Sequence, residues 1–309
     1  MERLTENKLI LVVRKTRLEE LIAKYNTISQ AKFYVEHLGA DFSDYLNEHE
    51  NYQRCVRQTE STLQSLGRVQ IVDRGFLSNF LFGPRDVVVA LGQDGLVANT
   101  LKYLDGHPLI GVNPDPKRWD GVLLPFNVND IGTIIPEVFS GKRQIKEVTM
   151  AKAQLNNGQS LYGVNDIFIG PKSHTSARYT IKLHDKQEQH SSSGVIVSTG
   201  LGSTGWLKSL LAGANAIANK QKAENAKNTQ SPWDADFLYF TVREPFPSNT
   251  SAASLVFGKI TQHSQLCMTS LMPENGVIFS DGIEADYLEF NSGIVAELGI
   301  AEKKGHLVV

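Results

Sequence analysis

Short apolar runs alternate with helical patterns in the first part of the chain. Four segments are mostly apolar, which is typical of strands buried on both faces of a sheet. They are residues 8–13, 69–72, 86–91 and 109–112. Between these segments, apolar side chains recur at helical spacing in 17–25, in 51–66 and in a short stretch that ends at Tyr103. Strands that alternate with helices predict a parallel sheet covered on both faces.

The pattern changes after about Phe126. From Gln144 to Leu183, and again from Phe237 to Phe290, short strand-like runs such as DIFIG and FLYFTV are separated by turn residues. One helical pattern, Trp206 to Ala218, lies between these two regions. It is followed by the polar stretch 219–231, which has almost nothing to bury and predicts a loop or a mobile helix end. The second half is therefore predicted to be mostly β.

Composition and charge exclude several classes of protein. Hydrophobic residues make up 41% of the chain and charged residues 21%, and no apolar run approaches the roughly 18 residues that a membrane-spanning helix needs. The start, MERLTENKLILVV, lacks the order of a signal peptide, so we expect a cytoplasmic protein. A net charge of -2 provides no basic field for nucleic acid. The two cysteines and eight histidines show no metal-ligand spacing, so we assign no metal site and expect a small-molecule ligand.

Two glycine-rich turns carry the candidate chemistry, and the first is Gly92-Gln93-Asp94-Gly95, directly after the predicted strand 86–91. In open α/β sheets, ligands bind at the carboxyl ends of the strands. Glycines let the main chain approach phosphate oxygens, and the following helix presents free N–H groups to an anion. A carboxylate at Asp94 could deprotonate a hydroxyl. The alternative is that Asp94 simply caps the helix, because Asp and Gly are common at such turns.

The second turn runs from Gly200 to Gly205 and contains the spacing GxGxxG between a predicted strand and a predicted helix. This order also fits a dinucleotide-binding βαβ unit, and hence a dehydrogenase. Against that alternative, the turn lies in the β-rich half and is crowded with hydroxyl groups that suit polar contacts. They belong to Ser198, Thr199, Ser203 and Thr204.

Taken in order, these segments resemble the NAD kinase family. Gly92-Gln93-Asp94-Gly95 resembles the family's GGDG turn, Asn165-Asp166 its Asn-Glu pair, and 198–206 its Ser-Thr-x-x-Gly-Ser-Thr-Ala-Tyr stretch. Other segments resemble the mitochondrial-type subgroup. They are PLIGVNPDP at 108–116, LLP at 123–125, NDIFIG at 165–170, SSG at 192–194 and VREP at 242–245. The resemblance covers about residues 8–300, and the order of the motifs is more specific than any single motif.

The resemblance implies a fold of the α/β plus β-rich class. An N-terminal α/β nucleotide-binding domain would cover 1–126, with the chain end 292–309 returning to it, and a β-rich NAD-binding domain would cover 127–291. The implied reaction transfers the γ-phosphoryl group of ATP to the 2'-hydroxyl of the adenosine ribose of NAD, giving NADP, with Mg²⁺ bound to the ATP. A homodimer or higher homo-oligomer is also implied.

The resemblance also implies roles for particular residues. Asp94 would be the base or orienting carboxylate for the ribose hydroxyl. Gly92 and Gly95 would line the phosphates, and Asn165 and Asp166 would bind the nucleotide, the carboxylate reaching ribose hydroxyls. The residues around the adenosine would be Ser203, Thr204 and Trp206, with Trp206 replacing the family's Tyr as a stacking surface. The candidate nucleotide-binding set also contains Gln93, Asn113, Ser193 and Thr199.

Other interpretations remain open at this point. Gln93 stands where the family has a second glycine and Leu96 where a threonine usually follows, so a nucleotide-binding protein without catalysis is one alternative. A related kinase acting on a lipid or another nucleoside is a second, because GGDG-like turns recur among diacylglycerol and sphingosine kinases. Judged by residue type alone, Asn113, Asn165-Asp166 and Asp281-Gly282 are ordinary turn residues and Trp206 an ordinary core aromatic. The preference for NAD or NADH, and for ATP or polyphosphate, is not encoded in any of these motifs.

Overall fold

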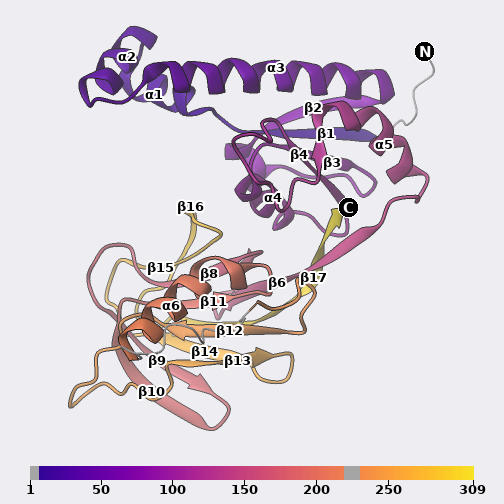
Figure 1. Ribbon diagram of the computed structural model, residues 1–309. Coiled ribbons are helices and arrows are strands. Elements are labelled where there is room, and N and C mark those ends of the chain that lie inside the picture. The colour runs from indigo at the N-terminus through magenta and orange to yellow at the C-terminus, as the bar shows by residue number, and fades with distance from the viewer. Residues whose placement is uncertain (1–6, 219–229) are drawn as a thin grey trace. The chain divides into compact units, whose positions relative to one another are not determined.

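The computed structural model describes residues 7–218 and 230–309 of the chain (Figure 1). They form two compact units, the first comprising Met1–Lys146 and His306–Val309, the second Glu147–Gly305. The predicted loop or mobile helix end at 219–231 lies outside the described residues apart from its last two positions. No helix in the described ranges is long and apolar enough to cross a membrane.

The first unit is built on a parallel sheet with the strand order β4-β3-β1-β2, and the end of β17 pairs with the outer side of β4. Its strands are β1 (Lys8–Val13), β2 (Arg68–Asp73), β3 (Val87–Leu91), β4 (Pro108–Asn113), β5 (Phe126–Asn127) and the last part of β17 (Val295–Val308). Its helices are α1 (Arg17–Tyr25), α2 (Ile28–His37), α3 (Phe42–Leu66), α4 (Asp94–Leu101) and α5 (Ile131–Phe139), with 3-10 turns at Arg74–Asn79 and Val128–Asp130. The predicted α/β class is confirmed for this part of the chain.

Helices cover both faces of this sheet, which explains why its strands are apolar throughout. Alternate residues such as Leu9 and Leu11 of β1 point into one core with Leu63 of α3 and Ile134 of α5. The short helix α4 contacts β3 and β4 and lies on the opposite side of the sheet from α3 (Figure 1). A strand that is buried on both faces has no polar face to alternate with, so it appears in the sequence as a continuous apolar run.

Helix α3 begins earlier than the predicted residue 51. Its first nine residues, 42–50, are mostly polar, and their only apolar stripe is the short set Phe42, Tyr45 and Leu46. They are helical because Asp41 caps the helix by accepting from the Ser43 N–H at 2.8 Å, and because Asp44 and Glu48 form ion pairs with Arg17. Capping and ion pairs, together with the burial of Phe42 against Leu18 and Val35, extend this helix.

The strand order of this sheet reverses between β1 and β3. From β1 the chain passes through three helices to β2 on one side of β1, and then crosses to β3 on the other side. The Tyr52 hydroxyl of α3 spans the carboxyl ends of β1 and β3, because it donates to the Leu91 carbonyl at 2.8 Å and accepts from the Arg14 N–H at 3.0 Å. This switch point is the place where open α/β sheets bind ligands.

The second unit contains two sheets. One has the order β10-β9-β14-β17, with β6 pairing to β17 and to β7, and the other is the antiparallel sheet β13-β12-β11-β8-β15-β16. The strands are β6 (Ile145–Leu155), β7 (Ser160–Gly163), β8 (Asp166–Pro171), β9 (Ala177–Leu183), β10 (Lys186–Ser192), β11 (Val195–Ser198), β12 (Phe237–Val242), β13 (Phe257–Thr261), β14 (Leu266–Ser270), β15 (Gly276–Ser280), β16 (Ile283–Glu289) and the first part of β17. A 3-10 turn at Gly202–Thr204 precedes α6 (Trp206–Ala218). The predicted β-rich class is confirmed here.

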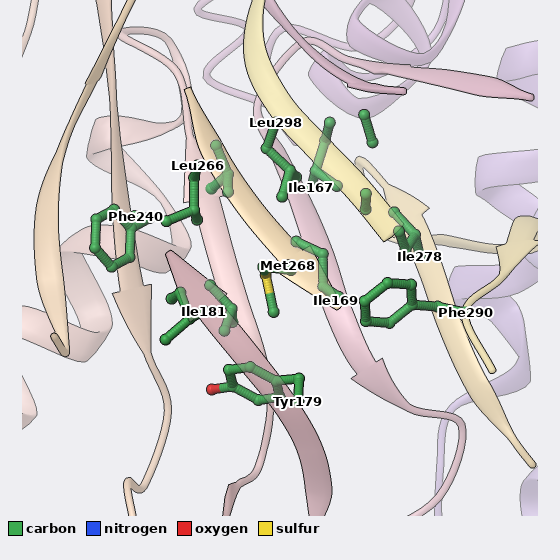
Figure 2. Packing of buried hydrophobic residues seen from close by; sticks show 14 of the residues in the cluster. Ile167, Ile169, Tyr179, Ile181, Phe240, Leu266, Met268, Ile278, Phe290 and Leu298 are labelled. Atoms are coloured by element: carbon green, nitrogen blue, oxygen red, sulfur yellow. The ribbon is translucent and has the colours of Figure 1, made fainter. Parts of the chain in front are cut away.

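Side chains from both sheets of the second unit meet in one core. Figure 2 shows Ile167 and Ile169 of β8 together with Ile181 of β9 and Met268 of β14. On the outer face of the six-stranded sheet, α6 packs Trp206 against a smaller cluster around Phe168 of β8. Strand β8 is therefore buried on both faces, which accounts for the apolar run DIFIG.

The boundaries of the two units fall later than residues 126 and 291. Val128, Ile131 and Ile135 belong to the core of the first unit, so that unit continues to Lys146. At the other end, the first residues of β17 pair with β14 in the second unit, and only the last four residues of the chain belong to the first. One long strand serves both units in turn, and no change of composition marks the point where it passes from one to the other.

Candidate active site

The turn after β3 places the amino end of α4 at the carboxyl edge of the parallel sheet. The Gly92 N–H donates to the Val112 carbonyl of β4 at 3.1 Å. Gln93 is the N-cap residue of α4, with an extended backbone and no side-chain capping bond, and its carbonyl accepts from the Leu96 N–H at 2.8 Å. The Gln93 side chain is thus not needed for the helix.

The Asp94 carboxylate binds the loop between β4 and β5. It accepts hydrogen bonds from the main-chain N–H groups of Leu123 at 2.7 Å and Val122 at 3.3 Å. Asp94 is the first residue inside α4 and Gln93 is its N-cap, so the alternative that Asp94 only caps the helix is wrong. The carboxylate instead holds the β4–β5 loop against the glycine-rich turn.

Asn113 organises the same loop from the end of β4. Its Nδ2 donates to the Trp119 carbonyl at 3.0 Å, and its Oδ1 accepts from the Asp115 N–H at 3.0 Å. The chain also passes very close to β4, because a Cβ on Gly111 would lie 2.0 Å from the Leu123 carbonyl oxygen. Asn113 is buried, and both the nitrogen and the oxygen of its side-chain amide form hydrogen bonds within the β4–β5 loop. Asn113 therefore stabilises the loop that donates hydrogen bonds to Asp94.

Leu96 belongs to the core of the first unit. Its side chain is 2% exposed, and its Cδ2 lies 2.8 Å from the position that a Cβ on Gly92 would take. The departure from the family's threonine at this position therefore faces the protein interior. It fills the space beneath the turn, and its Cδ2 would have to shift if position 92 carried a larger residue.

Arg14 adds a positive charge that sequence reasoning did not single out. It follows β1 at the switch point, and its Cδ lies 3.8 Å from the Cβ position of Gly92. Glu48 accepts from its Nη2 at 2.8 Å, and the guanidinium lies 4.9 Å from the Tyr52 ring centroid. Its Nε is buried and has no hydrogen-bond partner in the described part of the chain. The only sequence signal was a cation directly after a buried strand.

In the second unit, Thr199 braces the segment that carries Asn165 and Asp166. The Thr199 hydroxyl donates to the Val164 carbonyl at 2.6 Å, and the Thr199 N–H donates to the Asn165 carbonyl at 2.9 Å. The same hydroxyl accepts from the Gly202 N–H at 3.1 Å. Thr199 is buried, so its hydroxyl joins two parts of the site and is not presented as a ligand contact.

Ser203 is likewise used inside its turn. Its hydroxyl donates to the Gly200 carbonyl at 2.6 Å and accepts from the Ser231 N–H at 3.1 Å. Thr204, by contrast, is exposed, and its Oγ1 donates to the Leu201 carbonyl at 3.4 Å. Of the hydroxyls at this turn that resemble the family motif, Thr204 is therefore the one that faces solvent.

The first two glycines of this turn, Gly200 and Gly202, face the protein, and the dehydrogenase alternative is wrong. A Cβ on Gly200 would lie 1.8 Å from the Pro232 carbonyl oxygen, and one on Gly202 would lie 2.0 Å from the Asn165 carbonyl oxygen. Strand β11, which leads into the turn, is antiparallel to both of its neighbours, β8 and β12. A dinucleotide-binding βαβ unit requires parallel strands, so GxGxxG here serves close main-chain packing.

Asp166 is the buried ionisable group of this half of the site. It begins β8 and is 9% exposed. Burial and, second, the nearby Asp281 carboxylate raise the pKa of Asp166 to about 7. Near neutral pH this carboxyl group therefore exists in both its protonated and its ionised form.

Replacing Asp166 by Asn is expected to stabilise the protein at pH 8. An ordinary Asp has a pKa of about 3.9, so between about pH 4 and pH 7 the folded state holds a proton that the unfolded state has lost. The resulting stability is complete below pH 4 and is lost as the pH rises through 7. Asn has no charge to bury, so the melting temperature should rise by several degrees at pH 8, on the order of 1 kcal/mol or more, and by less at pH 5. Asp185→Asn, at an exposed turn, is the control, and an equal gain at both pH values would contradict the expectation.

Trp206 is half-buried at the start of α6. Its ring stacks on Phe168 with centroids 5.8 Å apart and planes inclined by 14°, and the Arg243 guanidinium lies 5.3 Å from its centroid. One face of the indole is therefore occupied within the protein. Ser193 and Thr199 lie beyond opposite ends of the four-residue strand β11, so the structure does not bring Ser193 next to Thr199.

The candidate residues thus form two groups, one in each unit. Gly92, Gln93, Asp94, Gly95 and Asn113, joined by Arg14, lie at the carboxyl edge of the parallel sheet. In the second unit, the segment Asn165-Asp166 lies against the turn that contains Thr199, Ser203 and Thr204, with Trp206 directly after it. The first unit is thus an open α/β sheet with a glycine-rich turn at its switch point, the place where such sheets bind ligands such as nucleotides, and it is followed by a unit of two packed β-sheets.

Known proteins resemble this chain both in sequence and in fold. No family model matches the sequence. The NAD kinase of Chlorobaculum tepidum is 30% identical over 138 residues, which cover 44% of this chain and 47% of that protein, so the chain matches about half the length of this relative. The human mitochondrial NAD kinase 2 is 23% identical over 95% of this chain and 82% of its own length.

Two solved structures have a fold similar to that of this chain. A yeast NADH kinase complexed with NADH superposes with a TM-score of 0.60 at 14% identity, covering 99% of this chain and 84% of that one. An NAD kinase from Archaeoglobus fulgidus in complex with ATP gives a TM-score of 0.57 at 13% identity, covering 98% and 93%. Together with the ordered motifs, these sequence and fold similarities support the resemblance of the chain to the NAD kinase family.

Proposed function

We propose that this protein is an ATP-dependent NAD kinase, which transfers the γ-phosphoryl group of ATP to the 2'-hydroxyl of the adenosine ribose of NAD and so forms NADP. The observation that carries the proposal is the turn 92–95, which sets a carboxylate and the amino end of α4 together at the carboxyl edge of the parallel sheet. Phosphoryl transfer asks a protein chiefly for positioning and charge neutralisation. A glycine-rich turn with one carboxylate can supply both.

In this reaction Asp94 orients the ribose hydroxyl and accepts its proton as the oxygen attacks the γ-phosphorus. The main chain of Gly92 and Gly95 and the free N–H groups of α4 face the phosphates, where they offset negative charge. Arg14 contributes a guanidinium on the same edge. General-base catalysis of this kind contributes about 10²- to 10⁴-fold to the rate.

The second group of residues binds the nucleotide. Asn165 and Asp166 bind the ribose hydroxyls, the ionised carboxylate of Asp166 acting as acceptor. Thr204 and the free face of Trp206 contact the adenosine. Thr199 and Ser203 act indirectly, because their hydroxyls hold the main chain of the site in place.

Magnesium suits this site only as a companion of the triphosphate. Within residues 7–218 and 230–309, no group of three or more His, Cys, Asp or Glu side chains could hold a metal ion. Mg²⁺ commonly binds through one or two carboxylates together with substrate phosphates. Bound to ATP, it would neutralise part of the charge on the phosphates. A homodimeric or higher oligomeric state and a cytoplasmic location complete the proposal, and sedimentation velocity would measure the first.

The direct test is NADP formation by the purified protein given NAD, ATP and magnesium. Product that accumulates with enzyme and time would support the proposal. Measurable NAD binding without product would favour the alternative of a nucleotide-binding protein that has lost catalysis. Phosphorylation of diacylglycerol or sphingosine in place of NAD would favour a lipid kinase.

Replacing Gly95 by Ala is expected to raise the KM for ATP by about tenfold or more, equivalent to ~1.4 kcal/mol of binding. No heavy atom lies within 4 Å of the position that the new methyl group would take, so the fold should be unaffected. The methyl group instead stands where the phosphates would approach. Gly213→Ala is the matched control, because that helical glycine also has nothing within 4 Å. Equal KM values in the two variants would mean that the phosphates do not approach Gly95.

A further inference from the structure

Asp281 and Gly282 form the turn of the hairpin between β15 and β16. Both residues have positive φ angles, 54° for Asp281 and 70° for Gly282, which is typical of a type I′ turn. Such turns favour Asn-Gly as much as Asp-Gly, because both side chains tolerate the left-handed region. The turn by itself therefore does not require a carboxylate at position 281.

The Asp281 carboxylate nevertheless binds three consecutive main-chain N–H groups of a distant segment. Val164 donates to its two oxygens at 3.0 Å each, Asn165 to Oδ1 at 2.6 Å, and Asp166 to Oδ1 at 3.4 Å. In return, the Asp281 N–H donates to the Asp166 carbonyl at 3.0 Å. Bonds from N–H groups to a carboxylate are among the stronger hydrogen bonds in proteins.

Thr199 binds the same segment from its carbonyl side. Its hydroxyl donates to the Val164 carbonyl and its N–H to the Asn165 carbonyl. The three N–H donors of the segment are thus taken by the Asp281 carboxylate, the carbonyls of Val164 and Asn165 by Thr199, and the carbonyl of Asp166 by the Asp281 N–H. With the main chain held in this way, the side chains of Asn165 and Asp166 are the groups left to bind a ligand.

We propose that Asp281 is a positioning residue of the nucleotide site, which holds the Asn165-Asp166 segment in the conformation that binds the ribose hydroxyls of NAD. This inference rests on the proposed function for its substrate. Asp281 does not touch the substrate itself. It acts through the main chain of the segment, and removing its carboxylate frees three N–H groups at once.

Asp281 also brings a negative charge close to Asp166. Burial and this charge together raise the pKa of the Asp166 carboxyl group. The strands β7, β11 and β15, which contact β8, carry no acidic or basic side chain, and Tyr162 of β7 is bonded to Glu302. Strand β9 carries Arg178 and Lys182, but both are exposed, on the face away from the core. A consequence of the proposal is that Asp281 sets the pH at which the site gains its negative charge.

Two substitutions separate positioning from charge, and both are compatible with the turn. Asp281→Asn keeps an acceptor oxygen and removes the charge. We expect its KM for NAD at pH 8 to stay within about twofold of the wild type, and the acid limb of its kcat/KM profile to move to lower pH by about half a unit or more. Asp281→Gly removes the acceptor as well, and we expect its KM for NAD to rise about tenfold or more, with a smaller change in kcat.

Measurements that need no activity keep this inference distinct from the proposed function. Amide hydrogen exchange at Val164, Asn165 and Asp166 should be faster in Asp281→Gly than in the wild type, and nearly unchanged in Asp281→Asn. Carboxyl NMR should place the Asp166 titration at lower pH in Asp281→Asn. If the wild type forms no NADP while these shifts occur, the proposed function fails and the role of Asp281 in holding the segment stands. Wild-type exchange and wild-type KM in Asp281→Gly would overturn the inference.

Discussion

Replacing Asp94 by Asn should lower NADP formation by about 10²- to 10⁴-fold, the contribution of a general base. The amide cannot accept the proton of the ribose hydroxyl, whereas its oxygen can still accept the bond that Leu123 donates at 2.7 Å. The loop between β4 and β5 should therefore keep its position. Steady-state kinetics with saturating NAD and ATP would measure the loss, which should fall on kcat rather than on KM.

Asp94 is both the proposed base and the anchor of the β4–β5 loop, so the experiment needs a control that the loop keeps its position. Val122 also donates to this carboxylate, and an amide nitrogen placed there would repel that N–H group. The melting temperature and the affinity for ATP should therefore be measured on the same variant, and both should stay close to the wild type. Asp120→Asn, at an exposed position of the same loop, should be fully active. If Asp94→Asn retains most of its activity, Asp94 only anchors the loop.

The second large effect is expected from Gly202→Ala, which should abolish most nucleotide binding and destabilise the second unit by about 1–3 kcal/mol or more. A Cβ on Gly202 would lie 2.0 Å from the Asn165 carbonyl oxygen and 2.9 Å from the Ser198 Oγ. No rotamer change relieves a clash with a main-chain oxygen. The segment that carries Asn165 would have to move, which breaks its bonds to Thr199.

Thermal unfolding and NAD titration would measure the two parts of this effect. Gly213→Ala in α6 is the matched control, because it adds the same methyl group in the same unit without a contact, and it should bind NAD normally. Normal binding and normal stability in Gly202→Ala would mean that the contact between the turn and the Asn165 segment is dispensable. Since Gly202 touches no proposed ligand position directly, a loss of binding would support the view that the glycines of this turn serve packing.

The apolar pattern was sufficient to predict most of the elements. The run KLILVV forms β1, and residues 17–25 and 206–218 form helices. These elements were predictable because the burial of apolar side chains is the dominant driving force of folding, and their spacing shows which element buries them. Two helical regions that were not predicted have only short apolar stripes. Helix α2 is capped by Thr27 and buries Ala31 and Val35, whereas the first nine residues of α3 bury Phe42 and form ion pairs with residues far apart in the chain, for example Asp44 with Arg118 at 2.5 Å.

The ordered motifs also carried the resemblance to the NAD kinase family and pointed to both groups of site residues. What they could not show was which side chains face a ligand and which face the protein. Thr199 and Ser203 have the same residue types as a ligand-binding turn, yet the structure buries both hydroxyls in main-chain bonds. GxGxxG likewise has the spacing of a dinucleotide site, and only the antiparallel neighbours of β11 exclude that reading.

The sequence by itself thus determined most of the elements, the two-part α/β and β-rich class, and the resemblance to the NAD kinase family, because each of these depends on local patterns or on the order of short motifs. Tertiary structure alone decided the role of Asp281, which looks like an ordinary turn residue until its carboxylate is seen to bind Asn165, 116 positions away. The physical reason is that a hydrogen bond depends on distance in space. Strand pairing between β8 and β15 brings these residues together, and no local pattern in a single sequence records which strands will pair.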